Sequence, residues 1–143
     1  MKRSLLVTCL AVPFLTGATV APVGGTLTVE VLNVRNAKGH VHVEVCTQAT
    51  FMKECPYFAV APSVKGTTTV SVPGVPVGVY AVQAFLDENS DNKVNRGLFG
   101  IPKEGVGFSN DALKGFSAPK WEDAKFSFNG QARTIQLKLR YYL

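Results

Sequence analysis

Two segments of the chain alternate between apolar and polar residues, and this alternation restricts the fold more than any other feature. Valine or leucine occupies every second position in residues 27–31 and 41–45, with Thr, His or Glu between. Because successive side chains of a β-strand point to opposite faces, this period predicts two strands that each bury one face. Residues 36–39 form a short connection that ends in Gly39, so we expect an antiparallel hairpin.

Two later stretches predict strands of different character. Residues 67–72 alternate again, with Val70 and Val72 expected to face inward. Residues 72–86 begin with a turn rich in Pro and Gly and continue as a strand that is apolar on both faces, which is typical of the centre of a sheet. The intervening residues 47–65 contain two prolines and predict an irregular loop or a short helical turn.

The end of the chain carries the strongest short hairpin pattern. Residues 125–128 and 132–142 flank Asn129-Gly130, a pair that suits the two positive φ angles of a type I′ turn. No stretch of the sequence shows a sustained helical periodicity. About seven short strands predict an all-β fold, an antiparallel β-sandwich of the immunoglobulin-like or prealbumin-like kind with one long functional loop.

The first 21 residues have the pattern of a secretory signal peptide. A basic start is followed by a short apolar run and then by small residues, and cleavage is expected after Ala18 or Ala21. The apolar run is too short to span a bilayer. We therefore expect a single β-sandwich domain over residues 22–143 that is not membrane-spanning and is periplasmic or secreted.

The cysteines and the charge agree with export. Cleavage removes Cys9 and leaves Cys46 and Cys55, which an oxidising compartment would join as a disulfide. A redox or metal-binding pair is the alternative, but the spacing matches neither CxxC nor a zinc site. The formal charge of +5 loses the two charges of Lys2 and Arg3 and becomes +3. The other basic residues are scattered, so we expect no nucleic-acid partner.

Oxygen-bearing side chains recur at alternate positions directly after the central strand, as in a calcium-binding loop. Position six of such a loop is Asn92, which can adopt the left-handed conformation of a glycine, and position twelve is Leu98 where a bidentate Glu would sit. The alternative is a solvated turn whose Asp and Asn side chains bond the local backbone. The candidate calcium ligands are Asp87, Asn89, Asp91, Lys93 through its backbone carbonyl, and Asn95.

Glycines recur every few residues in the segment that follows, residues 97–110. Their spacing fits neither GxGxxG nor a P-loop, so nucleotide binding is unsupported. Aromatic and charged residues are interleaved here and could form an apolar recess with a charged rim, suited to a small ligand or a peptide. The alternative is an Ω-like loop packed by its own side chains. The candidate ligand-binding residues are Phe99, Lys103, Glu104, Phe108 and Asn110.

His40, His42 and Glu44 share the polar face of one predicted strand. Same-face neighbours on a strand lie about 7 Å apart, so a transition metal could bridge the two imidazoles. Solvent-facing polar residues of a half-exposed sheet give the same pattern, and no fourth ligand is evident nearby in the sequence. For catalysis, the sequence has no GxSxG elbow, no HExxH and no evident Ser-His-Asp arrangement.

Several segments resemble the bacterial domain-of-unknown-function 2141 family. They are FMKECPY, PVGVYAVQAFLDEN, PKWEDAKFSF and, most specifically, FGIPKEG followed by GFSN. The resemblance covers essentially the whole mature chain and implies a periplasmic or secreted β-sandwich of Gram-negative type, without an established activity. The family's acidic run is often richer in Gly and Asp than the run here, which contains Ser90 and Asn92. The entry Gly78-Val79-Tyr80 is also similar to prealbumin-like and carboxypeptidase-regulatory-like sandwiches, which are mostly binding or spacer modules.

These observations favour an exported, non-enzymatic β-sandwich that acts as a binding or structural module of unknown ligand. Its partner would be a cell-envelope component or a small molecule, and calcium is the one cofactor that the sequence suggests. The alternative is a small envelope hydrolase or carrier that holds a cell-wall or sugar ligand in the recess of residues 97–110. Convergence of Lys103 and Glu104 on a concave pocket would favour this alternative.

Overall fold

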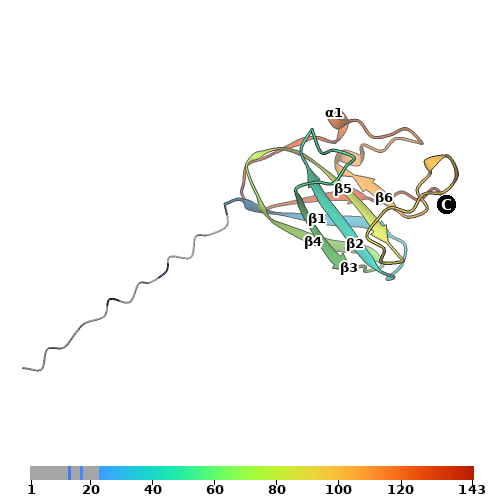
Figure 1. Ribbon diagram of the computed structural model, residues 1–143, viewed down its shortest axis with the longest axis horizontal. Coiled ribbons are helices and arrows are strands. Elements are labelled where there is room, and N and C mark those ends of the chain that lie inside the picture. The colour runs from blue at the N-terminus through green and yellow to red at the C-terminus, as the bar shows by residue number, and fades with distance from the viewer. Residues whose placement is uncertain (1–12, 14–16, 18–22) are drawn as a thin grey trace, which may run out of the picture.

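The computed structural model describes residues 13, 17 and 23–143, so the expected signal peptide lies almost entirely outside the described residues. Two β-sheets enclose a common apolar core (Figure 1). The smaller sheet has the strand order β4-β1-β8. The larger sheet has the order β3-β2-β5-β6, and β7 pairs with β5 beside β6. The prediction of an all-β sandwich is confirmed.

The described chain forms eight strands and three short helical segments. The strands are β1 (Gly25–Val34), β2 (His40–Cys46), β3 (Tyr57–Pro62), β4 (Gly66–Val75), β5 (Gly78–Asp87), β6 (Val106–Phe108), β7 (Phe126–Phe128) and β8 (Arg133–Lys138). The helical segments are η1 (Leu98–Gly100), η2 (Ser109–Asp111) and α1 (Trp121–Ala124). No helix in this part of the chain is long and apolar enough to cross a bilayer.

The main core lies between the sheets, and the alternating residues of β1, β2 and β4 fill it as predicted, Val70 and Val72 among them. Burying one such Val or Leu side chain contributes roughly 1.5–3 kcal/mol. The strand β5 is buried on both faces, also as predicted. Its residues Val82 and Leu86 point into this core, whereas Ala81 and Phe85 belong to a second cluster on the opposite face of the larger sheet.

The second cluster shows how the irregular segments are held. Phe108 and Leu113 belong to it, and Trp121 packs against it. Phe51, which precedes β3, packs edge-on against Trp121 with ring centroids 5.7 Å apart and against Phe108 at 6.0 Å. Three segments far apart in the sequence therefore share one apolar layer on the outer face of the larger sheet.

Both predicted hairpins are wrong. β1 pairs with β4 and β8, whereas β2 pairs with β3 and β5, so residues 36–39 cross from one sheet to the other. A Cβ on Gly39 would lie 1.9 Å from the carbonyl oxygen of Asp87, so this crossing packs directly on the end of β5. At the other end of the chain, β7 pairs with β5 and β8 runs parallel to β1. Gly130 has positive φ but Asn129 does not, so the turn is not type I′.

Two strands lie where the sequence predicted loops. β3 occupies part of residues 47–65 and pairs only with β2, so it is an edge strand. β6 is three residues long and lies inside the Gly-rich segment. The disulfide between Cys46 and Cys55 is present as predicted, and it ties the end of β2 to the loop before β3.

Candidate functional site

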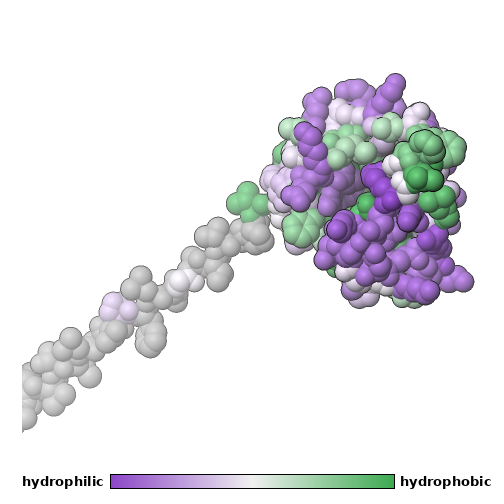
Figure 2. All heavy atoms as spheres, turned by 45° about the vertical axis from the view of Figure 1, so that its right-hand side comes forward, coloured by the Kyte–Doolittle hydropathy of each residue, from purple (hydrophilic) through white to green (hydrophobic). Residues whose placement is uncertain are grey.

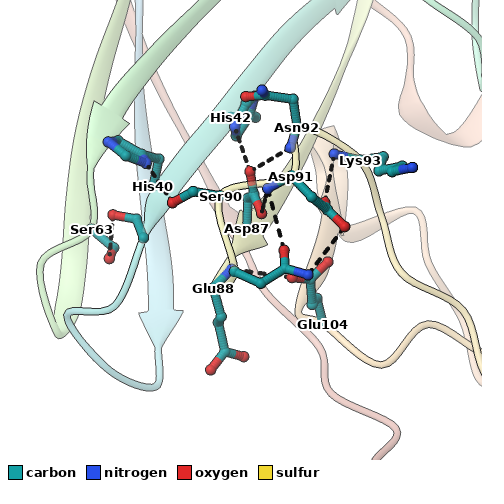
Figure 3. A network of polar contacts seen from close by, with 12 residues as sticks. His40, His42, Ser63, Asp87, Glu88, Ser90, Asp91, Asn92, Lys93 and Glu104 are labelled. Carbon is teal, nitrogen blue, oxygen red and sulfur yellow. Dashed lines mark hydrogen bonds and ion pairs between the residues drawn. The ribbon is translucent and has the colours of Figure 1, made fainter.

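Asp87 ends β5 and organises the acidic loop that follows (Figure 3). Its side chain is fully buried, and its carboxylate accepts hydrogen bonds from the backbone N–H of Asp91 at 3.1 Å and of Asn92 at 2.9 Å. Nε2 of His42 lies 3.3 Å from the same carboxylate without the direction of a hydrogen bond. The buried carboxyl group is therefore held by two backbone donors and one imidazole contact, and these contacts bend the chain back over the sheet.

The other predicted calcium ligands with side-chain oxygens converge on Asp91. Its Oδ2 accepts hydrogen bonds from Nδ2 of Asn95 at 2.7 Å and Nδ2 of Asn89 at 3.1 Å. The bond from Asn95 is the main cause that lowers the pKa of Asp91; slight burial opposes it, and Asn89 and Lys93 add to the lowering. Asp91 is thus an ionised carboxylate surrounded by two side-chain amides.

The loop also has the turn that the sequence predicted at its sixth position. Asn92 adopts a φ of +62°, the left-handed conformation expected of a residue that replaces glycine there. Leu98, at position twelve, is exposed, and its side chain has no oxygen to offer an ion. Glu104, predicted to lie at the recess, stabilises this loop instead. It is buried, and its carboxylate accepts hydrogen bonds from the N–H of Glu88 and from the N–H of Asn95, both at 3.1 Å.

His40, His42 and Glu44 turn to separate partners. His42 stacks on Phe85 with ring centroids 4.5 Å apart, and Nδ1 of His40 lies 3.4 Å from Oγ of Ser90. Glu44 accepts a hydrogen bond from Gln83. In residues 23–143, Glu44 also has its carboxylate within 4.8 Å of Sγ of both Cys46 and Cys55, but the disulfide occupies these sulfurs.

A cleft of about 720 Å³ lies on the outer face of the larger sheet. Phe85, Val106 and Phe108 line its floor, from β5 and β6. Three loops form its walls, namely residues 52–54 next to the disulfide, residues 92–102, and residues 113–119. Asn92 and Lys93 belong both to the acidic loop and to the cleft wall, so the two features are joined.

The cleft contains two of the five predicted ligand-binding residues. Phe108 is buried in its floor, and Phe99 stands on its rim with 98% of its surface exposed. Lys103 is exposed and Glu104 is buried under the acidic loop, and neither lines the cleft. Asn110 donates through Nδ2 to the carbonyl oxygens of residues 123–125 at 3.1–3.2 Å, which makes it a structural tie.

Sequence reasoning missed the walls that come from other loops. Met52 and Lys53 reach the cleft through the disulfide loop, and Phe116 reaches it through the segment before α1. Gln83 holds the disulfide loop in place, because its side chain accepts the N–H of Met52 and donates to the carbonyl of Lys53. The large aromatic Phe116 between a glycine and a serine was the one sequence feature that could have indicated this wall.

The buried hydroxyl of Ser109 fixes the segment that follows β6. Its Oγ donates to the carbonyl of Ala124 at 2.6 Å and accepts the N–H of Val82 at 2.9 Å. This hydroxyl therefore joins the central strand β5 to α1 and holds the third wall of the cleft against the sheet.

The fold and the cleft define a class of protein, a two-sheet β-sandwich domain with a loop-walled cleft on the outer face of its larger sheet. The sequence profile of a family described as an uncharacterized protein conserved in bacteria (DUF2141) matches residues 29–136. The chain belongs to this family, as its FGIPKEG and GFSN segments predicted. Searches among curated proteins and among solved structures gave no match.

Proposed function

We infer that the protein is an exported, non-enzymatic binding module that holds a small apolar or amphipathic ligand in the cleft, and that calcium stabilises the adjoining loop of residues 87–95. Export is supported by the signal-peptide pattern of residues 1–21 and by the disulfide. The observation that carries the proposal is the cleft itself, with an apolar floor on a rigid sheet and walls tied by a disulfide and by buried hydrogen bonds.

The case for calcium is the convergence of oxygen ligands. Asn89, Asp91 and Asn95 already lie within hydrogen-bonding distance of one another. Turning the two amides over would direct their oxygens toward an ion beside Asp91, and the carbonyl of Lys93 and the carboxylate of Asp87 supply further oxygen ligands. Because Asn92 and Lys93 also line the cleft, an ion here would rigidify one cleft wall.

Thermal unfolding in calcium and in chelator tests the ion. An ion that binds only the native state stabilises it by about 2.7 kcal/mol at roughly a hundredfold excess over Kd, so we expect the melting temperature to rise by several degrees in calcium. The variant Asp91→Asn should lose this rise, whereas Asp111→Asn, an exposed aspartate outside the loop, should keep it. Equal melting temperatures of the wild type in calcium and in chelator would contradict the calcium site.

Titration with the fluorescent probe anilinonaphthalene sulfonate tests the cleft. The folded wild type should bind the probe, and the variant Ala118→Trp, which places an indole in the cleft, should bind it at least tenfold more weakly. Ala132→Trp is the matched control, because Ala132 is exposed and does not line the cleft. If Ala118→Trp binds the probe as tightly as Ala132→Trp, the cleft is not the binding site.

A further inference from the structure

The residues 95–103 form a small rigid projection, which we call the tip loop; it is the yellow-to-orange loop at the right of Figure 1. Its two arms are joined by hydrogen bonds from the N–H of Gly97 to the carbonyl of Ile101 and from the N–H of Lys103 to that of Asn95, both at 2.8 Å. The guanidinium of Arg96 donates to the carbonyl of Gly100 at 2.9 Å and closes the turn. The tip loop is therefore preorganised.

The tip loop directs large apolar side chains into solvent. Leu98 is 83% exposed and Phe99 is 98% exposed. Phe99 takes a φ of +59°, a rare conformation for a bulky aromatic residue, so the backbone is strained to hold this ring outward. Phe116, 83% exposed, lines the same cleft, and Leu143, 65% exposed, packs beside Gly97. In Figure 2 this end of the molecule is turned toward the viewer. Hydrophobic residues, in green, gather at the right of the face beside hydrophilic residues, in purple.

Cationic side chains flank this apolar tip. Lys93, Arg96 and Lys103 are all exposed, and none of them takes part in an ion pair between residues of the described chain. Of the acidic groups near them in the sequence, Asp87 and Glu104 are buried and accept backbone hydrogen bonds. Asp91 is partly exposed, but its carboxylate is bonded by the side-chain amides of Asn89 and Asn95 and forms no salt bridge with a lysine or arginine of the described chain. The tip loop thus presents two exposed apolar side chains with three exposed cationic side chains around them.

We propose that the tip loop docks this domain onto an anionic lipid surface. Leu98 and Phe99 enter the headgroup region, and Lys93, Arg96 and Lys103 contact the lipid phosphates. A protein partner would also cover exposed apolar residues, but three exposed cations around the apolar tip that form no salt bridge within the described chain match a surface that is both apolar and anionic. The proposal goes beyond ligand binding in the cleft, and it requires neither a cleft ligand nor calcium.

Co-sedimentation with vesicles tests the proposal. The full chain is expressed with its own N-terminal segment and prepared identically for all variants, so that any contribution from that segment is common to them. Binding is measured to vesicles of phosphatidylglycerol and phosphatidylcholine in equal parts and to vesicles of phosphatidylcholine alone. We expect the wild type to prefer the anionic vesicles and to dissociate as salt concentration rises.

Two double variants separate the apolar contribution from the charges. Leu98→Ser with Phe99→Ser should weaken binding to anionic vesicles at least tenfold, because both side chains lose their apolar contact. Lys93→Gln with Lys103→Gln should weaken it about twenty-five-fold, at about fivefold for each lysine. Arg96 is left in place because it closes the turn. All replaced side chains are exposed, so melting temperatures should change little.

The matched controls are Phe58→Ser and Lys65→Gln, an exposed aromatic and an exposed lysine away from the tip loop, which should bind as the wild type does. Equal binding by the wild type and the Leu98/Phe99 variant would overturn the proposal. Failure of the wild type to bind anionic vesicles would also overturn the proposal and would point to a protein partner for this surface. Equal binding to neutral and anionic vesicles would remove the role assigned to the lysines and thereby the proposal as stated.

Discussion

Phe99 combines two unfavourable features in one residue. Its ring is almost fully exposed, and its backbone lies in the left-handed region, which costs a residue with a Cβ roughly 1–2 kcal/mol. No packing of its own side chain compensates for this strain. The hydrogen bonds of the neighbouring residues, from Arg96 to Gly100 and from Gly97 to Ile101, hold the conformation instead.

Replacing this residue by glycine should therefore not destabilise the protein. Phe99→Gly relieves the strain but raises the entropy of the unfolded chain, so we expect the free energy of unfolding to stay equal or to rise by up to about 1 kcal/mol. Phe58→Gly makes the same exchange in the edge strand β3, where φ is not positive. This variant should lower the free energy of unfolding by about 1 kcal/mol. Denaturant unfolding of both variants measures the difference; a loss of stability in Phe99→Gly would show that the ring has a structural role.

The strands that sequence could predict are those with a clear burial pattern. β1, β2 and β4 each bury one face, and β5 is buried on both, so their periods were visible in the residues. β3 is apolar on its exposed face as well as on its half-buried face and is bounded by prolines, and β6 is a short run within glycines, so neither shows a clear alternation in the sequence.

The pairing of strands was less predictable because a short turn can join neighbours in one sheet or cross between two. Residues 36–39 and Asn129-Gly130 both suit hairpins locally, yet both cross between the sheets. What decides the outcome is burial: β1 and β2 must place their apolar faces toward each other across the core, which two strands joined in one flat hairpin cannot do. Such information is not local to the turn.

The same limit applies to the candidate site. The acidic loop was visible because its ligand types recur at fixed spacing, and its turn at Asn92 follows from local chemistry. The cleft was only partly visible, because two of its walls come from loops far away in sequence that meet over β5. Glu104, which the sequence suggested as a rim residue, lies under the acidic loop instead. Its place could not be foreseen, because only the folded loop brings near it the N–H donors that a buried carboxylate needs.

At the scale of elements, one ion pair links the ends of the two sheets. Arg35, just after β1, donates through Nε to Oε1 of Glu88, just after β5, at 2.8 Å, and Asn36 donates to Oε2 at 2.7 Å. Burial acts to raise the pKa of Glu88, but these hydrogen bonds together with the charges of Arg35 and Lys38 outweigh it and lower the pKa. Stability from a lowered pKa is present above the ordinary pKa of a glutamate and is lost as pH falls through the folded-state value.

Glu88→Gln should thus lower the free energy of unfolding by about 1 kcal/mol at neutral pH. The difference from the wild type should vanish in acid, below the folded-state pKa of Glu88, where the wild type has also lost the charge. Denaturant unfolding over a series of pH values measures both. Glu54→Gln serves as control, since Glu54 is exposed and forms no ion pair with any residue of the described chain. A constant difference over the whole pH range would contradict the role given to the Glu88 charge.

At the scale of the whole molecule, β6 closes one side of the sandwich. Val106 exchanges two backbone hydrogen bonds with Arg140, just beyond β8, at 3.0 Å and 2.8 Å. A Cβ on Gly107 would lie 2.7 Å from the carbonyl oxygen of Lys138, so this close approach of the two sheets requires glycine. The cleft floor therefore rests on the junction between the two sheets.

The parallel pairing of β1 with β8 joins residues 106 positions apart in the chain. If the chain is threaded through a membrane from its N-terminus, β1 emerges first and keeps one unpaired edge until the last strand has followed. Contacts of such long range form late and slowly, and an open edge invites pairing with other chains. Assembly of this small domain would then be completed only at the end of translocation, and the interval before β8 arrives would be the stage at which a chaperone has most to protect.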